Sequence, residues 1–277
     1  MTAVLIIGAG WLGRPLAKQL SASNHTVHVT NSSHENTEES LEFGLSAHQL
    51  QLPLPCIQPL ASLIEQLKIE VVIGCITPGF RRSATPDWDS YANNWQQICD
   101  AAKQGGARKV IMISSTAVYP SVSKDMKEDD ASLELALGSN DFSKKSLALL
   151  QAEQKIIESG MDYVVIRCSG LVDEIRHPSR FAMRLRSVSR NAPANMLHRV
   201  DAVGMVEYAM THIGHDIINA STPNTCDKAQ FYQAAIDARS LNISLPEVVD
   251  TPDKQIDSSK SVKLGYQYHF QHTLDLL

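Results

Sequence analysis

Three glycines near the start of the chain have the spacing that a phosphate-binding turn requires. Gly8, Gly10 and Gly13 follow the apolar run 4–7 and stand at the start of a stretch with helical periodicity. Gly8 would permit the tight turn, Gly10 would let the backbone approach a pyrophosphate, and Gly13 would let the helix pack closely on the strand. The strand before these glycines and the helix after them favour a dinucleotide site over a glycine turn that only packs.

The residues around these glycines complete the predicted phosphate site. A pyrophosphate would lie at the N-terminus of the helix, where unpaired N–H groups and the helix dipole attract an anion. Trp11, Leu12 and Arg14 stand at this end of the helix, and we take them as candidate cofactor ligands together with the glycines.

The end of the second predicted strand bears on the choice of cofactor. Binding of NAD normally uses an Asp or Glu there to hold the ribose 2′-hydroxyl, but no acidic residue occurs before Glu35. Asn31 and Ser32 can accommodate a 2′-phosphate, and Arg14 is near enough in the sequence to help neutralise it. We therefore expect NADP(H), with NAD(H) as the alternative. A different interpretation of Arg14 is a solvated residue on the helix surface.

Composition and charge limit the classes to which the chain can belong. The 277 residues carry a formal net charge of −5, which gives no reason to expect nucleic acid or a membrane as partner. No apolar run approaches the ~20 residues of a membrane span, and the first strand follows the N-terminal Met so closely that we expect no signal peptide. The five cysteines lack C-x-x-C spacing, which favours a reducing cytoplasm over disulfides or zinc. We expect a cytoplasmic protein with a small-molecule substrate and no metal, and a homodimer is compatible with this expectation.

Residues 1–170 alternate between strand and helix patterns, which predicts βαβ units and a parallel sheet. The expected strands are 3–7, 26–30, 46–51, 70–74, 108–114 and 162–167. The expected helices are 12–22, 57–68, 88–104 and 143–159. The predicted fold class is therefore α/β, with a Rossmann-type, doubly wound parallel sheet that binds a dinucleotide.

Residues 171–277 break this alternation. Prolines separate short helices near 179–190, 201–213 and 227–240 and short strands near 216–220 and 246–249. We expect a small C-terminal α+β substrate cap, with some segments returning to the main domain. Such a cap would lie over the carboxyl edge of the sheet, where ligands bind in open α/β folds.

A second chemical motif follows the strand predicted at 108–114. Ser114, Ser115 and Thr116 are consecutive hydroxyl residues, and Tyr119 comes three residues later. The strand would deliver these hydroxyls to the carboxyl edge of the sheet, facing the cofactor. Ser114 is a candidate cofactor ligand, and Ser115 and Thr116 could orient a carbonyl or hydroxyl group of a substrate.

The sequence Ser-Ser-Thr-x-Val-Tyr after this strand resembles the extended short-chain dehydrogenase/reductase family, which includes nucleotide-sugar epimerases and dehydratases. Other landmarks occur in the family's order: the segment 71–77, Asn94, the acidic pair Glu128-Asp129, Arg167 and the segment 195–201 that resembles N-x-I-H-x-x-D. The resemblance covers essentially the whole chain and is closest to an atypical, epimerase-like subgroup with a short cap. It implies that Thr77, in the loop passing the nicotinamide ribose, and Asn94 are cofactor ligands.

The chain departs from this family where proton transfer should occur. The family uses a Tyr-x-x-x-Lys pair on the helix after the serine strand, in which the lysine lowers the pKa of the tyrosine. The segment 139–153 contains no tyrosine. If Glu153 is the family's helix glutamate, Lys145 takes the tyrosine position and Leu149 the lysine position. If Phe142 takes the tyrosine position, Ser146 stands where lysine belongs, so neither register restores the pair.

Few residues could replace the missing pair. Ser115 and Thr116 are poor acids unaided. Tyr119 is near enough in the sequence to donate a proton, although in the family it usually packs beside the nicotinamide. Lys144 or Lys145 could transfer a proton if burial lowers its pKa, although lysines on a helix are mostly solvated. The candidate catalytic residues are Thr116, Ser115, Tyr119 and Lys145.

The predicted cap carries an excess of positive charge, because no acidic residue lies between Glu174 and Asp201. Arg180 and Arg184 are four residues apart, on one face of the predicted helix, and could bind an anion bidentately. Related folds place the diphosphate of their substrate in this region. The candidate substrate ligands are Arg176, Arg180, Arg184 and His198. The alternative is a solvated basic helix.

Two functions are compatible with these residues. The first is an NAD(P)-binding, epimerase/dehydratase-like oxidoreductase that acts on a small, anionic or nucleotide-linked, sugar-like substrate. The second is a catalytically silent NAD(P)-binding sensor or regulatory protein, which would explain the missing Tyr-x-x-x-Lys pair. The cap favours the first, because a bare cofactor sensor needs no substrate site.

Overall fold

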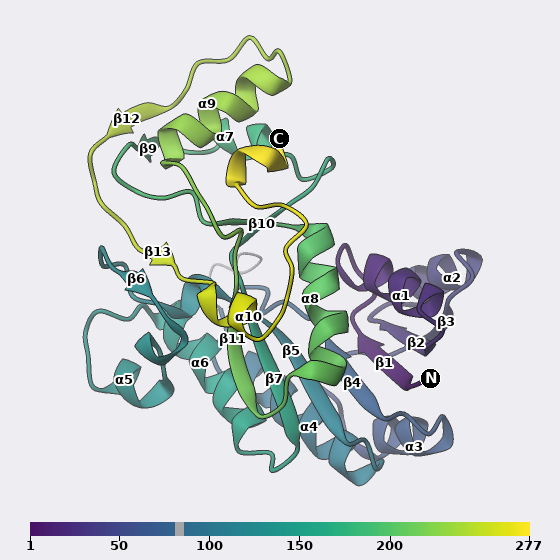
Figure 1. Ribbon diagram of the computed structural model, residues 1–277. Helices are drawn as coiled ribbons and strands as arrows, with labels where there is room; N and C mark the ends of the chain where they lie inside the picture. Colours follow the sequence, from purple (N-terminus) through teal and green to yellow (C-terminus); the bar gives the residue numbers. More distant parts are fainter. Residues whose placement is uncertain (81–85) are drawn as a thin grey trace. The chain divides into compact units, whose positions relative to one another are not determined.

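The computed structural model describes residues 1–80 and 86–277, and the chain packs into two compact units (Figure 1). Unit 1 contains Met1–Ser114, Lys144–Ile166 and Val206–Ile217. Unit 2 contains Ser115–Ser143, Arg167–Met205 and Ile218–Leu277. The predicted boundary at residue 170 is close to the division at 166/167. The structure also assigns 115–143 to unit 2 and returns 206–217 to unit 1.

The central sheet has seven strands in the order β11-β7-β5-β4-β1-β2-β3. These are β1 Ala3–Ile7, β2 Thr26–Asn31, β3 Ser46–Gln49, β4 Val71–Gly74, β5 Lys109–Ser115, β7 Asp162–Cys168 and β11 Asp216–Ala220. The pairs β1–β2, β1–β4, β2–β3 and β4–β5 are parallel. The order 3-2-1-4-5 is that of the Rossmann fold, so the predicted α/β class and Rossmann-type sheet are confirmed.

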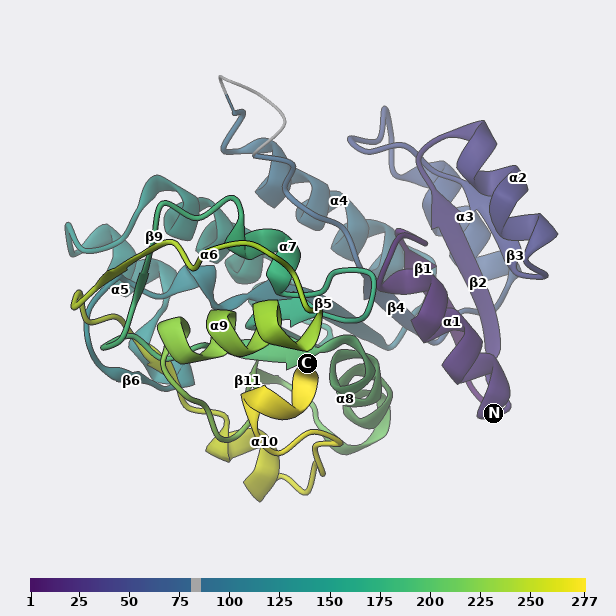
Figure 2. The ribbon, with the colours of Figure 1, turned by 90° about the horizontal axis from the view of Figure 1, so that it is seen from above.

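The sheet of unit 1 is covered by amphipathic helices, because parallel strands that are apolar on both sides must be covered on both faces. Val4, Leu5 and Ile6 of β1 are fully buried, and so are Leu16 and Leu20 of the first helix. Figure 2 shows the first two helices beside β1, β2 and β3. The helices are α1 Gly13–Ala22, α2 His34–Glu42, α3 Gln58–Gln66, α4 Ser90–Gln104 and α6 Lys144–Ile157; α8, Arg199–His212, ends in this unit.

Helix α2 is absent from the predicted elements, because its sequence His-Glu-Asn-Thr-Glu-Glu-Ser-Leu-Glu has no apolar stripe. Only Thr37 and Ser40 are buried in it. The signal that could have revealed it is local: the side chain of Ser33 accepts a hydrogen bond from the Asn36 N–H and caps the helix.

Unit 2 is built from short helices and two-stranded pairs. The strand pairs are β8 Gly170–Val172 with β10 Met196–His198, β9 Ser187–Ser189 with β12 Glu247–Val249, and β6 Asp125–Met126 with β13 Gln255–Ile256. The helices are α5 Leu133–Leu137, α7 Ser179–Ala182, α9 Lys228–Ala238 and α10 Ser259–Lys263, with the 3-10 turns η1 Thr116–Val118, η2 Glu128–Asp130 and η3 Thr273–Leu276. One buried apolar cluster joins Ala182 and Val188 to Phe231, Tyr232 and Ile236.

The predicted helix over 179–190 is wrong in most of its length. The chain is helical only over α7, and residues 187–189 form β9 instead. Val188 is 2% exposed in the cluster with Phe231, so burial of this side chain and pairing with β12 outweigh the helical periodicity that the arginines suggest.

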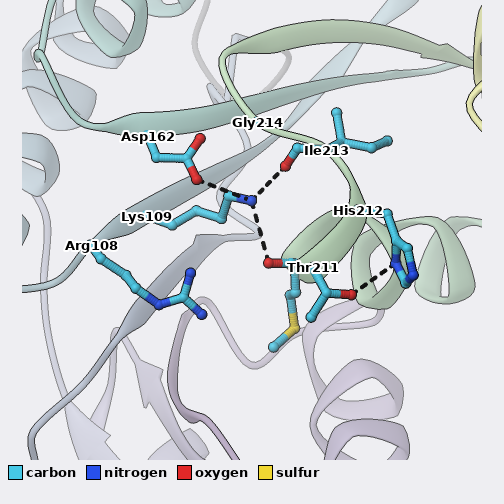
Figure 3. A pocket seen from close by; sticks show the side chains of 8 residues that line it. Arg108, Lys109, Asp162, Thr211, His212, Ile213 and Gly214 are labelled. Carbon is cyan, nitrogen blue, oxygen red and sulfur yellow. Dashed lines mark hydrogen bonds and ion pairs between the residues drawn. The ribbon is translucent and has the colours of Figure 1, made fainter.

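A buried lysine connects the amino end of β5 to the end of α8 in unit 1 (Figure 3). The Nζ of Lys109 donates to the main-chain oxygens of Ala209, Met210 and Ile213 at 3.2, 3.3 and 2.5 Å, and lies 3.2 Å from Oδ2 of Asp162. These carbonyls carry the negative end of the helix dipole, so a cation stabilises them. The adjoining hollow of about 380 Å³ lies at the amino ends of β5 and β7, opposite the edge where ligands bind in this fold.

We expect acidification to weaken unit 1 through the neighbouring His28 and His48. Nδ1 of His28 lies 3.3 Å from Nε2 of His48, and both rings are half-buried on β2 and β3. Burial lowers the pKa of both imidazoles, and His48 lowers that of His28 further. Below the ordinary histidine pKa of ~6.5, the unfolded chain therefore binds more protons than the folded chain. The free energy of unfolding consequently decreases as the pH is lowered from about 7 to 5.

Urea unfolding at both pH values measures this loss. His48→Gln should make it smaller, because only one imidazole then titrates at this position. His34→Gln, at an exposed position on α2, serves as the control and should keep the loss of the wild type. An equal loss in wild type and His48→Gln would contradict the assignment.

Candidate dinucleotide-binding and catalytic site

The three glycines of the loop after β1 occupy three different environments in unit 1. Gly8 has φ +100°, and a Cβ there would lie 3.1 Å from the carbonyl oxygen of Cys75. A Cβ at Gly13 would lie 2.2 Å from the carbonyl oxygen of Gly8. A Cβ at Gly10 would meet no described atom within 4 Å. The geometry thus matches a turn glycine, a packing glycine and, at Gly10, an open approach for a ligand.

The N-terminus of α1 is open to an anion. Leu12 is the N-cap residue and makes no side-chain cap, and the first turn of the helix contains no acidic residue. An apolar N-cap leaves N–H groups that a helix normally satisfies with a side chain, water or ligand. These groups and the helix dipole suit the pyrophosphate of a dinucleotide, and the role of Trp11, Leu12 and the glycines as its ligands stays a prediction.

The loop is fixed to the end of β2. The N–H of Ala9 donates to the carbonyl oxygen of Thr30 at 2.8 Å, and the N–H of Gly8 donates to Thr30 Oγ1 at 3.3 Å. Asn31 is buried, and its Oδ1 accepts a hydrogen bond from Ser40 at 3.0 Å. Ser32 is exposed. Of these two predicted ligands, only Ser32 presents its side chain to solvent.

Arg14 is engaged by unit 1 itself, an arrangement that neither interpretation of the sequence contained. Its Nη2 lies 2.5 Å from Oε2 of Glu39, its Nε donates to the carbonyl oxygen of Ala9 at 3.1 Å, and its guanidinium lies 5.4 Å from the ring centre of Phe43. The hydrogen bond from Arg14 lowers the pKa of the Glu39 carboxyl. Helix α2, missed in the sequence, supplies this carboxylate.

Thr77 and Asn94 follow β4 in the positions that the family resemblance implies. Thr77 is exposed after the strand, and Asn94 lies on α4. The Oδ1 atom of Asn94 is buried without a hydrogen-bond partner among the described residues. Because buried amide oxygens are nearly always paired, this atom calls for a donor from a bound molecule or a water, and it fits a cofactor site.

The hydroxyl of Ser114 at the end of β5 donates to a carboxylate. Its Oγ lies 2.5 Å from Oε1 of Glu153 on α6, and both residues are buried. Ser114 is a predicted cofactor ligand, but its hydroxyl proton forms a hydrogen bond to Glu153 within unit 1. Glu153 is a residue whose role the sequence did not reveal, although the family register already singled it out as the helix glutamate.

Helix α6 carries no tyrosine at the positions of the missing pair. Lys145 is half-buried in its first turn, whereas Ser146 and Leu149 are buried and Lys144 is exposed. Among the residues at those positions, only Lys145 can lose and regain a proton near neutral pH, provided that its pKa is lowered.

In unit 2, the hydroxyl residues that follow Ser114 start a 3-10 turn. Ser115 Oγ accepts a hydrogen bond from the N–H of Ala117 at 3.2 Å and so caps η1. Thr116, the first residue of the turn, is half-buried. The hydroxyl of Thr116 therefore remains the better candidate of the two for contact with a substrate.

Tyr119 belongs to a buried network in unit 2 and is not placed as a proton donor. Its hydroxyl donates to Oδ1 of Asn219 at 2.6 Å and accepts from Nη1 of Arg167 at 3.0 Å. Arg167 is fully buried and also donates to the carbonyl oxygens of Glu128 and Ala131. Burial raises the pKa of Tyr119 to about 12. The expectation that Tyr119 supplies a catalytic proton therefore does not fit its position.

The arginines of the predicted cap do not share a helical face. Helix α7 ends before Arg184, so the inference that Arg180 and Arg184 lie on one face of a helix is wrong. Nη1 of Arg180 donates to the carbonyl oxygen of Ile175 at 2.7 Å, and the N–H of Arg176 donates to Asp173 at 2.6 Å. All three arginines are exposed, and their role as substrate ligands stays a prediction.

The 195–201 motif fastens the C-terminal segment within unit 2. The carboxylate of Asp201 accepts hydrogen bonds from the N–H groups of His269 and Phe270 at 2.6 and 3.2 Å. Nδ1 of His198 accepts from the Val200 N–H at 3.2 Å, and its ring lies 4.5 Å from that of Phe270. Burial lowers the pKa of His198, so the imidazole is neutral and carries its proton on Nε2.

Over residues 1–80 and 86–277, no cluster of three or more histidine, cysteine or carboxylate side chains could hold a metal ion. Over the same residues, no helix has the length and apolarity needed to cross a bilayer.

The chain is similar to proteins that share its whole length. It is 26% identical over 281 residues to Protein YeeZ of Escherichia coli (strain K12), covering 99% of this chain and 98% of that protein. The enzyme WbmH of Bordetella bronchiseptica in complex with NAD⁺ has a TM-score of 0.76 at 18% identity, covering 100% of this chain and 96% of that one. The UDP-glucose 4-epimerase of Thermus thermophilus in complex with NAD has a TM-score of 0.77 at 16% identity, covering 99% and 97%. At these identities the two structures show a shared fold.

Residues 4–203 match the NAD dependent epimerase/dehydratase family. This match confirms the resemblance that the order of the motifs predicts, from the glycine loop to the N-x-x-H-x-x-D segment. The chain belongs to the NAD-dependent epimerase/dehydratase family.

Proposed function

We propose that the protein binds a nicotinamide dinucleotide at the Gly8–Gly13 loop and is an epimerase/dehydratase-type oxidoreductase. Its substrate would be small and sugar-like, either anionic or nucleotide-linked. The observation that carries the proposal is the loop itself, in which Gly10 is open, Gly13 packs on Gly8, and the N-terminus of α1 is uncapped. The amide oxygen of Asn94, which has no hydrogen-bond partner in the described part of the chain, adds a second polar group that calls for a partner.

The chain's own residues divide the work as follows. The loop and the α1 dipole hold the pyrophosphate, and Thr77 and Asn94 contact the nicotinamide half of the cofactor. When bound, the nicotinamide ring accepts and returns a hydride. Thr116 orients a hydroxyl or carbonyl of the substrate. The preference for NADP(H) that the sequence suggests requires that Arg14 be available to a 2′-phosphate, and Arg14 is paired with Glu39.

Proton transfer is assigned to Lys145. The family's Tyr-x-x-x-Lys pair is absent, and Tyr119 donates its proton to Asn219. An ordinary lysine pKa of ~10.4 is too high for a base at neutral pH, so Lys145 can act as a base only where desolvation outweighs the attraction of nearby anions. This assignment rests on the position of Lys145 at the start of α6.

The substrate class is supported by charge and by the relatives. Unit 2 carries several cationic and hydrogen-bonding groups in a segment without acidic residues, between Glu174 and Asp201. These groups are Arg176, Arg180, Arg184 and the neutral His198. The Thermus structure is of an enzyme that, by its name, acts on UDP-glucose. A sugar linked to a diphosphate would supply the anion that these arginines attract.

A catalytically silent dinucleotide-binding protein is the second candidate. The observation that favours it is the loss of both expected proton donors, since α6 lacks the tyrosine and Tyr119 is buried in its network. Such a protein would bind the dinucleotide tightly and turn over no sugar.

Gly10→Val should abolish binding of NADH and NADPH without unfolding unit 1, because the new side chain meets open space in the free protein and blocks the approach of the pyrophosphate. Isothermal titration measures the binding. Gly13→Ala is the matched contrast: its Cβ would lie 2.2 Å from a carbonyl oxygen, so it should lower the unfolding temperature itself. If wild-type protein binds neither dinucleotide below millimolar, the proposal is wrong.

Thr116→Val and Lys145→Met should each lower turnover without large changes in cofactor affinity. Loss of acid–base help alone is worth about 10²–10⁴-fold in kcat. Tyr119→Phe should instead destabilise the fold by about 1–3 kcal/mol, because Arg167 and Asn219 lose a buried partner. The assay is dinucleotide oxidation or hydride exchange with a panel of keto-sugars and sugar nucleotides. Tight dinucleotide binding with no turnover of any of them would leave the silent binding protein as the function.

Arg184→Ala should weaken the binding of UDP or a UDP-sugar roughly tenfold, because one charge-assisted contact to the diphosphate is lost. Arg190→Ala removes the same charge nearby, but Arg190 is paired with Asp250 at 2.9 Å, so it should change affinity little. Titration of the cofactor-loaded protein measures both. Equal affinities for wild type and Arg184→Ala would show that Arg184 is a solvated surface residue and not a substrate ligand.

A further inference from the structure

A carboxylate on α2 forms an ion pair with Arg14, the cation that directly follows the glycine loop. Arg14 stands directly after the last glycine of the loop, and its Nε binds the carbonyl oxygen of Ala9 inside that loop. Ala9 is in turn tied to Thr30 at the end of β2, the place where dinucleotide folds recognise the ribose 2′ position. The guanidinium that could receive a 2′-phosphate is therefore in place, but Glu39 already holds it at 2.5 Å.

Three groups of unit 1 contact the side chain of Arg14. Besides Glu39 and Ala9, the guanidinium of Arg14 lies over Phe43, the residue after α2. The side chains of Arg14 and Glu39 are 25% and 46% exposed, so both are still accessible to a ligand. An incoming phosphate would have to displace the carboxylate or share the guanidinium with it.

Sharing would bring two anions together. A 2′-phosphate adds close to two negative charges, and like charges at hydrogen-bond distance repel strongly. The rest of α2 adds to this field, since it contains Glu35, Glu38 and Glu42 and no lysine or arginine. The neutral 2′-hydroxyl of NAD(H) meets no such repulsion, and a carboxylate is the group that ordinarily accepts its hydrogen bond.

We propose that Glu39 sets the cofactor specificity of this protein by holding Arg14, so that the chain selects NAD(H) over NADP(H). The acid that the family usually carries at the end of β2 is thus supplied from the second turn of a helix that follows it. This proposal rests on the proposed function, because it requires a dinucleotide in the Gly8–Gly13 loop. It also reverses the preference expected from the sequence, where Arg14 had no visible partner.

The test is a double-substitution cycle read by equilibrium binding of NADH and NADPH, with no turnover needed. Wild type should bind NADH more tightly. Glu39→Gln keeps a hydrogen-bonding side chain but removes the charge, so it should shift the affinity ratio toward NADPH by tenfold or more. Adding Glu39→Gln to Arg14→Ala should shift the ratio less than threefold, because the cation that Glu39 releases is gone.

Glu42→Gln is the matched control, since it removes an identical charge from the exposed end of the same helix. It should leave the ratio within twofold of wild type. An unchanged ratio in Glu39→Gln, with NADH still bound, would overturn the role of Glu39 alone. An equal shift in Glu42→Gln would also overturn it, because the effect would then belong to the general charge of α2. Failure of wild type to bind either dinucleotide would overturn the proposed function itself.

Discussion

The contact between Gly13 and the carbonyl of Gly8 is the constraint on which the rest of unit 1 depends. No side chain fits between them, since a Cβ on Gly13 would lie 2.2 Å from that oxygen. Helix α1 can therefore start directly beside the end of β1, and its buried residues Leu16 and Leu20 reach the sheet. The same closeness brings Arg14 against Ala9 and α2. The absence of a Cβ at Gly13 thus sets both the packing of α1 on β1 and the position of Arg14.

Unit 2 is organised by a different device, a fully buried guanidinium. Arg167 has no exposed surface and donates to Tyr119 and to the carbonyls of Glu128 and Ala131. A buried charge is tolerated only when its donors are satisfied, so the loop from 119 to 131 is shaped around this residue. The family signature Ser-Ser-Thr-x-Val-Tyr therefore divides into parts: Thr116 is half-buried at the start of η1, whereas Tyr119 completes the packing of Arg167.

Much of the fold could be predicted from the sequence, because long amphipathic helices and apolar strands have distinct periods. The Rossmann-type parallel sheet and the tight turn at Gly8 are examples. Helix α2 could not be found this way, since it buries only Thr37 and Ser40 and depends on the cap at Ser33. Because this helix is missing from the predicted elements, Glu39 could not be recognised as the partner of Arg14. The local sequence after α7 predicts a helix, but it forms β9 instead, because the burial of Val188 depends on pairing with the distant strand β12.

The hydrogen-bond partners of individual side chains were harder to predict from the sequence than the elements of the fold. Ser114 and Tyr119 were placed correctly at the end of β5 and beyond it, yet their hydrogen bonds go to Glu153 and Asn219, far along the chain. Spacing within a motif says which residues reach an edge of the sheet. It does not say which of them are already satisfied by the protein, and a satisfied hydroxyl is a poor catalyst.

The burial of Lys109 has a consequence for how the chain matures during synthesis. Its ammonium is held by carbonyls at positions 209–213, about a hundred residues later in the sequence. Until residues 209–213 have left the ribosome, the carbonyl partners of the Lys109 ammonium are missing. Burial of an unpaired ammonium in a protein core is unfavourable. The central sheet is thus completed late, although its glycine loop is among the first residues made. A nascent chain would present the Gly8–Gly13 loop well before it presents a finished fold.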